Sequence, residues 1–233
     1  MTLVVIPTYN EKETIGALLQ ALQKTLSCHI LVVDDASPDG TGQLLEAYRE
    51  KNPSVYCLHR PKKLGLGSAY RDGFQWALAK NYDPVVQMDA DGSHDVRYLD
   101  DFITRSTQCD LVIGSRYVDG GGVVVSWGLH RRLMSSAGNR YINTILQMKD
   151  RRYQIRDSTG GFKCWRAATL RAIGVEKVQA DGYAFQVEMN WHAIRMGAKV
   201  CEAPIVFQDR IGGRSKIARS GILQTALLPF RLQ

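Results

Sequence analysis

The sequence contains no long hydrophobic run. No stretch of about 18 consecutive apolar residues occurs, so no helix of this chain is expected to span a bilayer. The first apolar segment, residues 3–6, begins almost at Met1 and is too short for the hydrophobic region of a signal peptide. With 233 residues, 45% of them hydrophobic, the chain is expected to be a folded protein with a sizeable core.

Cysteine is scarce and irregularly spaced. The five cysteines are Cys28, Cys57, Cys109, Cys164 and Cys201. Because they are odd in number and show no Cys-x-x-Cys pair, neither a disulfide framework nor a zinc site is expected. The simpler interpretation is a protein of a reducing compartment.

The glycine signatures of two common nucleotide-binding folds are also missing. The segment PTYNE (residues 7–11) follows the first predicted strand, where a dinucleotide-binding protein would show Gly-x-Gly-x-x-Gly. Gly65 and Gly67 occur too late and lack the Lys-Ser/Thr pair of a P-loop. No RNA-binding, zinc-finger or helix-turn-helix signature occurs, so a nucleic-acid partner is not expected.

Acidic residues are rare in the second half of the chain. The net charge is +7, and the acids between residues 127 and 166 are only Asp150 and Asp157. From residue 210 to the end there is no acid among several Arg and Lys residues. This asymmetry indicates an anionic partner, such as a phosphorylated substrate or a membrane surface.

Short apolar runs alternate with segments of helical periodicity. Strands are predicted at 3–6, 29–33, 55–58, 84–88, 111–114 and 199–207. Helices are predicted from about 11 to 26, 41 to 50, 95 to 105, 129 to 148, 165 to 173 and 184 to 196, and another follows RPKKLGLGSAY and reaches about residue 79. This alternation predicts an α/β fold with a mostly parallel central sheet flanked by helices.

Polar residues follow three of the predicted strands. PTYNE, DDASPD (34–39) and DADGSHD (89–95) each begin where a strand ends, and ligands of parallel sheets bind at that edge. Asp89 and Asp91 offer hard oxygen ligands to a divalent cation that also bridges phosphates. An isolated Asp-x-Asp beside glycine is more often an ordinary acidic turn. Ser93 is a further metal candidate, whereas His94 is expected to be a local hydrogen-bonding residue.

Seven segments carry a resemblance to a known family. In chain order they are PTYNE, DDASPDGT, GLGSAYRDG, DADGSHD, GSRY, STGGFK and DRIGGRSK. Together they resemble the family-2 glycosyltransferases, and more narrowly the dolichyl-phosphate (polyprenyl-phosphate) mannosyltransferases. The resemblance implies a single GT-A domain over residues 1–233. Its nucleotide-sugar half would be 1–117, and its acceptor half, with a closing basic loop, 118–233.

The resemblance also implies an activity. It is the inverting transfer of mannose from GDP-mannose to a polyprenyl or dolichyl phosphate, with Mg²⁺ or Mn²⁺ as cofactor. Asp89 and Asp91 would hold the metal, and Arg116 would meet phosphate through its planar guanidinium. The full set implied to bind the nucleotide sugar is Pro7, Tyr9, Glu11, Val33, Asp35, Asp89, Ala90, Asp91, Arg116, Arg210 and Lys216.

The acceptor needs no strong general base. A phosphate monoester is mostly ionised near neutral pH, so it can attack the anomeric carbon directly. Arg131 and Ser135, one helical turn apart, are candidates for holding this phosphate; a solvated basic helix face is the alternative. Glu188 is expected to shape the sugar site together with Gln186 and Asp157.

The lipid acceptor implies contact with a membrane surface. Helix 127–148 and the tail 222–232 mix apolar and basic residues, which suits either a membrane interface or a packed core. The protein is expected at the cytoplasmic face of a membrane. It would bind there peripherally, through partner subunits, or through transmembrane spans absent from this chain. Two other functions stay open: a UDP-glucose:undecaprenyl-phosphate glucosyltransferase and a non-catalytic sugar-nucleotide-binding subunit.

Overall fold

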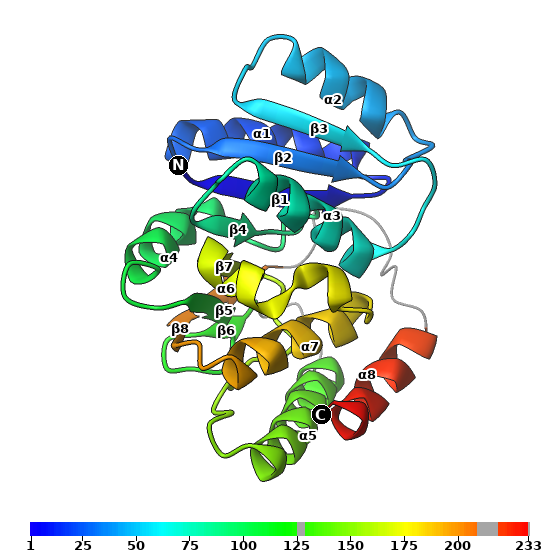
Figure 1. Cartoon of the computed structure of the whole chain (residues 1–233). Helices are drawn as coiled ribbons and strands as arrows, with labels where there is room; N and C mark the ends of the chain where they lie inside the picture. Colours follow the sequence, from blue (N-terminus) through cyan, green and yellow to red (C-terminus); the bar gives the residue numbers. More distant parts are fainter. Residues whose placement is uncertain (125–128, 209–218, 233) are drawn as a thin grey trace.

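The computed structural model describes residues 1–124, 129–208 and 219–232, without the side chains of 129–132 and 219–223. Within these residues, strands form a seven-stranded sheet in the order β3-β2-β1-β4-β7-β5-β8 (Figure 1). All its neighbouring strands are parallel except β7, which runs antiparallel to β4 and β5. The strands are β1 (Leu3–Thr8), β2 (His29–Asp34), β3 (Val55–His59), β4 (Val85–Gln87), β5 (Leu111–Ser115), β7 (Lys163–Trp165) and β8 (Val200–Pro204).

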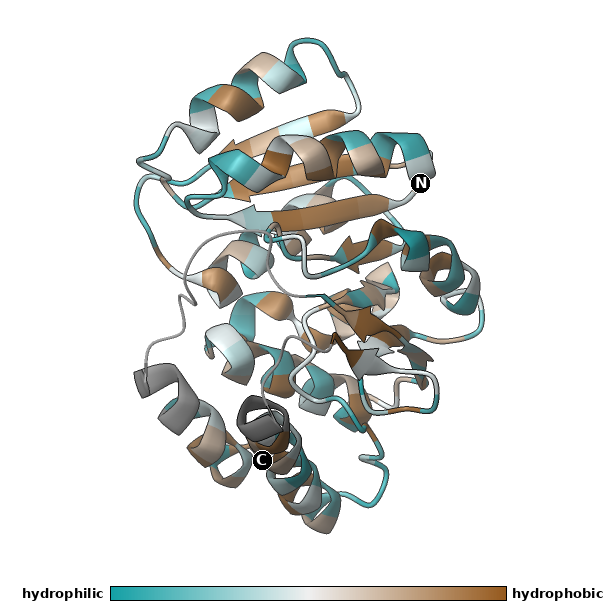
Figure 2. Ribbon diagram, turned by 180° about the vertical axis from the view of Figure 1, so that it is seen from behind, coloured by the Kyte–Doolittle hydropathy of each residue, from teal (hydrophilic) through white to brown (hydrophobic). Residues whose placement is uncertain are grey.

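Alternate residues of the strands supply two separate cores. From β1, Val4 and Ile6 face one side with α1, whereas Leu3 and Val5 face the other side with α3 and α7. Both layers are fully covered, which explains why these strands are apolar throughout. Figure 2 shows the hydrophobic strands between helices that carry their hydrophilic residues outward. The helices are α1 (Lys12–Thr25), α2 (Thr41–Arg49), α3 (Leu66–Ala79), α4 (Leu99–Arg105), α5 (Leu129–Lys149), α6 (Ala167–Ile173), α7 (Gly182–Arg195) and α8 (Arg219–Arg231).

Two details of the predicted sheet were wrong. The short strand β7 was not predicted, because three residues are too few to show a period. The predicted strand 199–207 divides at Ile205 into β8 and β9 (Val206–Phe207). Strand β9 leaves the main sheet and pairs with β6 (Gly122–Val123), which was not predicted either. These deviations all lie in the second half of the chain.

Helices α5 and α8 lie side by side at one end of the molecule (Figure 1). The Tyr141 hydroxyl donates to the carbonyl of Ala226 at 3.2 Å, and Lys149 Nζ donates to the carbonyl of Phe230 at 3.4 Å. The range of α5, Leu129–Lys149, confirms the helix predicted at 129–148. Among the described residues, no helix combines the length and the apolar character needed to cross a membrane.

One expectation about cysteine was wrong. Cys109 and Cys201 form a disulfide, with their Cα atoms 6.0 Å apart and a sequence separation of 92. The pairing arises because β5 and β8 are neighbours, with Val112 opposite Cys201. Sequence spacing carries no information about this tertiary contact. The cysteine pattern therefore no longer supports a reducing compartment.

Candidate active site

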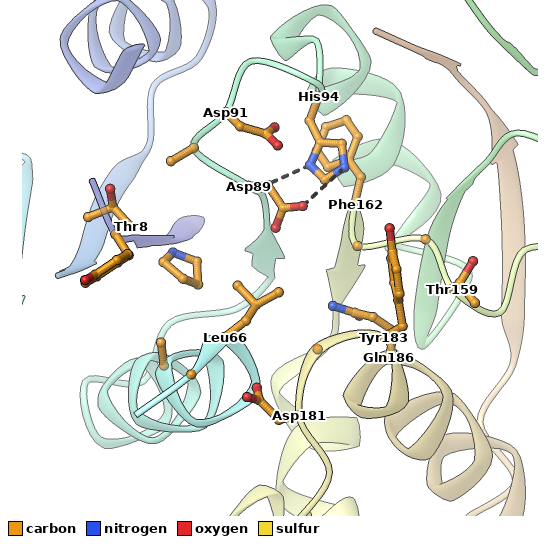
Figure 3. A pocket seen from close by; sticks show the side chains of 18 of the residues that line it. Thr8, Leu66, Asp89, Asp91, His94, Thr159, Phe162, Asp181, Tyr183 and Gln186 are labelled. Carbon is orange, nitrogen blue, oxygen red and sulfur yellow. Dashed lines mark hydrogen bonds and ion pairs between the residues drawn. The ribbon is translucent and has the colours of Figure 1, made fainter. Parts of the chain in front are cut away.

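A cavity of about 400 Å³ opens at the carboxyl ends of β1, β2 and β4 (Figure 3). Its wall combines residues from both halves of the chain. Of the predicted nucleotide-sugar residues, the cavity brings together Pro7, Tyr9, Glu11, Asp35, Asp89, Ala90, Asp91 and Arg116. From the second half it adds, among others, Gly160, Gly161, Tyr183 and Gln186. Val33 has its side chain in the hydrophobic core and is not among the lining residues.

The end of β1 forms one side of the cavity. Lys63 Nζ lies 3.9 Å from the ring centroid of Tyr9, a cation–π contact that fixes the ring. Thr8 lines the cavity, and its buried hydroxyl has no hydrogen-bond partner within the described residues. A buried polar atom without a partner is costly, so this hydroxyl favours a polar ligand in the cavity.

Asp35 joins the end of β2 to the loop before α3. Its carboxylate accepts from the backbone N–H groups of Leu64 and Gly65, both at 2.9 Å. It also pairs with the buried Arg60 at 3.0 Å. This carboxylate therefore organises the loop that carries Lys63, and its contact with a nucleotide stays a prediction.

Asp89 follows β4 and is held from two sides. The Tyr70 hydroxyl donates to Asp89 Oδ1 at 2.7 Å, and the Asp89 backbone N–H donates to His94 Nδ1 at 3.0 Å. Since Nδ1 accepts, the proton of neutral His94 sits on Nε2. Burial lowers the pKa of His94, so it stays neutral near pH 7. The prediction that His94 is a local hydrogen-bonding residue is confirmed.

Asp91 and Ser93 form a compact turn after Asp89. Asp91 Oδ1 accepts from the Ser93 backbone N–H at 3.1 Å and from its hydroxyl at 2.6 Å. The carboxylates of Asp89 and Asp91 line the same cavity, whereas Nδ1 of His94 accepts a hydrogen bond from the backbone N–H of Asp89. Two carboxylates from the protein fit a hard cation such as Mg²⁺ or Mn²⁺, which takes its other ligands from phosphate and water.

Arg116 lines the cavity, but its guanidinium is bound to the protein. Its Nε and one terminal nitrogen donate to the two oxygens of Asp157 at 2.8 and 2.7 Å, and that same nitrogen donates to Thr159 at 2.9 Å. Arg116 is 8% exposed and Asp157 is fully buried. The Asp157 carboxylate outweighs burial and raises the pKa of Arg116. Arg116 thus fixes the loop 157–161, and its predicted contact with phosphate stays a prediction.

The loop fixed by Arg116 approaches Asp89 closely. A Cβ atom on Gly161 would lie 3.3 Å from Asp89 Oδ2, and one on Gly160 would lie 3.2 Å from the carbonyl of Gly114. Glycine is therefore the residue that fits both positions without displacing a neighbour. The only earlier signal for this wall was the segment STGGFK, because no periodicity points to it.

Glu188 and Asp157 do not reach the cavity. Glu188 Oε2 accepts from the Ala180 backbone N–H at 2.9 Å, and neither residue is among those that line the cavity. Both residues hold loops, so any shaping of a sugar site by Glu188 and Asp157 is indirect, and that role stays a prediction. Gln186, named with them, does line the cavity.

The acceptor residues and the closing loop are described only in part. The Ser135 hydroxyl lies 2.9 Å from the hydroxyl of Tyr117, next to Arg116. Arg131 belongs to α5, but its side chain lies outside the described part, and Arg210 and Lys216 lie outside the described residues. The roles of these residues stay predictions.

Comparison with known families identifies the domain. The model of glycosyl transferase family 2 matches residues 3–174. The chain belongs to this family. It is 42% identical over 227 residues to an undecaprenyl-phosphate mannosyltransferase of Micrococcus luteus, covering 97% of this chain and 90% of that protein. It is 41% identical to a polyprenol monophosphomannose synthase of Mycolicibacterium smegmatis, covering 95% of this chain and 82% of that one.

Solved structures share the fold of this glycosyltransferase. A Pyrobaculum calidifontis mannosyltransferase, in complex with GDP-Man and Mn²⁺, matches with a TM-score of 0.60 and 17% identity, over 97% of this chain and 69% of that one. A glucosyl-3-phosphoglycerate synthase of Mycobacterium tuberculosis matches with a TM-score of 0.66 and 16% identity, over 100% and 81%. The predicted GT-A fold, with its mostly parallel sheet between helices, is confirmed.

Proposed function

We propose that this enzyme transfers mannose from GDP-mannose to a polyprenyl (dolichyl) phosphate, with inversion at the anomeric carbon. The observation that carries the proposal is the convergence of Asp89 and Asp91 with the ends of β1 and β2 in one cavity. The two curated relatives, each more than 40% identical over almost the whole chain, are named for mannosyl transfer to polyprenyl carriers.

Different residues of the cavity would bind different parts of the sugar donor and its metal ion. Pro7, Tyr9, Glu11 and Asp35 would hold the guanosine end. Asp89 and Asp91 would hold Mg²⁺ or Mn²⁺, which when bound neutralises charge on the leaving diphosphate. The phosphate acceptor is already ionised near pH 7 and needs no base. This agrees with the neutral, buried His94 and with Glu188 outside the cavity.

The decisive experiment is a donor and acceptor panel. Purified protein, radiolabelled GDP-mannose, polyprenyl phosphate and Mg²⁺ should yield a labelled lipid, and EDTA should abolish the product. Failure with polyprenyl phosphates of every chain length would sink the proposal. Product from UDP-glucose, and none from GDP-mannose, would establish the glucosyltransferase alternative. Tight GDP-mannose binding without any product would establish the non-catalytic one.

A peripheral contact with a membrane follows from the same acceptor. The apolar side chains of Leu133, Met134 and Met148 on α5, and Phe230 on α8, are more than half exposed. Basic residues accompany them on the same two helices, a combination suited to an anionic interface. We place this surface in the acceptor half, 118–233, and the carboxylates of Asp89 and Asp91 in the nucleotide half, 1–117. Binding to anionic but not neutral vesicles tests it, with partner subunits as the other route to the membrane.

A further inference from the structure

We propose that the buried Lys163 fixes the side-chain amide of Gln186, so that its N–H donors face the sugar end of the cavity and bind a hydroxyl of the transferred sugar. Gln186 is then a specificity residue and Lys163 a positioning residue. The inference rests on the proposed function, because it assigns the sugar of the donor to this end of the cavity.

A chain of three hydrogen bonds sets the direction of the amide. The indole Nε1–H of Trp165 donates to Gln87 Oε1 at 3.1 Å, and Gln87 Nε2 donates to Gln186 Oε1 at 2.7 Å. Lys163 Nζ donates to the same Oε1 at 2.9 Å. The indole N–H has no acceptor to offer, and neither has Lys163 in its protonated form, which prevails below the pKa of about 7 that burial gives this lysine. Since both ends of the chain are donors, each amide between them has one allowed orientation.

The opposite orientation of Gln186 would place its NH₂ group against two donors. Gln186 is only 2% exposed, and Gln87 and Lys163 are fully buried, so water cannot replace the lost bonds. Lys163 reinforces the arrangement, because it also donates to Asn190 Oδ1 at 2.8 Å and to the carbonyl of Gln186 at 3.2 Å. All three ammonium N–H groups therefore have acceptors.

The fixed Nε2 lies beside the Asp89 carboxylate. The Cβ position of Gly161 is 3.6 Å from Gln186 Nε2 and 3.3 Å from Asp89 Oδ2, so both atoms flank the same narrow space. In Figure 3 Gln186 reaches from α7 into the cavity that Asp89 enters from β4. A donor and an acceptor on either side of one space suit a hydroxyl group, which accepts one hydrogen bond and donates another.

The test compares GDP with GDP-mannose in titration calorimetry, because GDP lacks the sugar. Gln186→Met keeps the volume and removes the donor. Its affinity for GDP should stay within about twofold of the wild type, while its affinity for GDP-mannose falls about tenfold, as for one lost hydrogen bond. Gln186→Glu replaces the donor by a second carboxylate near Asp89 and should lower kcat/KM for transfer about 100-fold.

Lys163→Met tests the positioning. If Lys163 acts through Gln186, this variant shows the same selective loss of GDP-mannose affinity, and the double variant with Gln186→Met is no worse than Gln186→Met alone. Lys177→Met, at an exposed position, is the matched control. Unchanged GDP binding by each variant verifies the fold.

Three results would overturn the inference: an equal loss of GDP and GDP-mannose affinity in Gln186→Met, full GDP-mannose affinity in Lys163→Met, or losses that multiply in the double variant. None of these readouts needs turnover. A wild-type protein that does not bind GDP-mannose at all would instead contradict the proposed function.

Discussion

The two walls of the cavity are built in different ways. On the nucleotide side, Asp35, Asp89 and Asp91 follow the ends of β2 and β4, and each carboxylate is held by a group of helix α3 or of a nearby loop. On the opposite side, Gln186 and the loop 157–161 are held by buried charges, Lys163 and the Arg116–Asp157 pair. The first wall presents charge to a ligand, whereas in the second the charges of Lys163 and Asp157 are buried and Gln186 presents a neutral amide.

This difference indicates separate tasks. Carboxylates at strand ends are suited to a cation and its phosphates, where large electrostatic energies decide the rate. A neutral wall oriented by buried charges is suited to a sugar, whose hydroxyls need donors and acceptors in fixed directions. Substitutions in the first wall should therefore affect chemistry most, and those in the second wall stability and selectivity.

The largest effect is expected at Asp91. In Asp91→Asn the amide oxygen still accepts from Ser93, so the turn persists while the negative charge is lost. Transfer should fall about 1,000-fold, since metal-held charge stabilisation supplies several kcal/mol. Mannosyl transfer and thermal unfolding are measured together. Asp95→Asn is the control, because Asp95 lies in the same loop, binds Arg97 and is not among the residues that line the cavity. More than a tenth of wild-type activity in Asp91→Asn would refute the metal role.

The next effect is a loss of stability at Arg116. Arg116→Met leaves Asp157 buried without its partner, which should lower the free energy of unfolding by about 3–5 kcal/mol. Urea denaturation measures this change. Arg152→Met removes the exposed partner of Asp150 and should leave stability unchanged. Equal unfolding midpoints for wild type and Arg116→Met would show that this wall does not depend on the ion pair.

The third effect is on the pH dependence of stability. Burial lowers the pKa of Lys163 to about 7, whereas an unfolded lysine titrates near 10.4. Between these values the unfolded chain binds more protons, so this residue makes stability rise with pH. From pH 7 to 8.5 the free energy of unfolding of the wild type should gain about 1–2 kcal/mol relative to Lys163→Met. Parallel pH curves for the two proteins would rule out a titrating Lys163.

The smallest effect is expected at Ser135. Ser135→Ala removes one hydroxyl near Tyr117 and, under the proposed function, one contact with the acceptor phosphate. The KM for polyprenyl phosphate should rise about fivefold, as for one hydrogen bond, with the KM for GDP-mannose unchanged. Initial-rate kinetics with each substrate varied will measure both. Ser136→Ala, its exposed neighbour, is the control, and a rise in the KM for GDP-mannose alone would exclude the acceptor role.

The nucleotide wall was largely predictable. Apolar runs marked β1, β2 and β4 because parallel strands are covered on both faces, and the acids after them mark the ligand edge of such a sheet. The second wall was not, because β7 is too short to show a period and it enters the sheet antiparallel. Gln186 was named, yet its orientation depends on Gln87 and Trp165, which lie far from it in sequence.

The sequence by itself determined the α/β class, the strand ends that carry Asp35, Asp89 and Asp91, and the family to which the chain belongs. Those features are local, since each depends on a short run of residues and its period. Only the tertiary structure decided that Arg116 binds Asp157, that Lys163 is buried behind Gln186, and that Cys109 meets Cys201. Such pairs depend on which strands become neighbours, and charges buried between them are stable only where the folded chain supplies their partners.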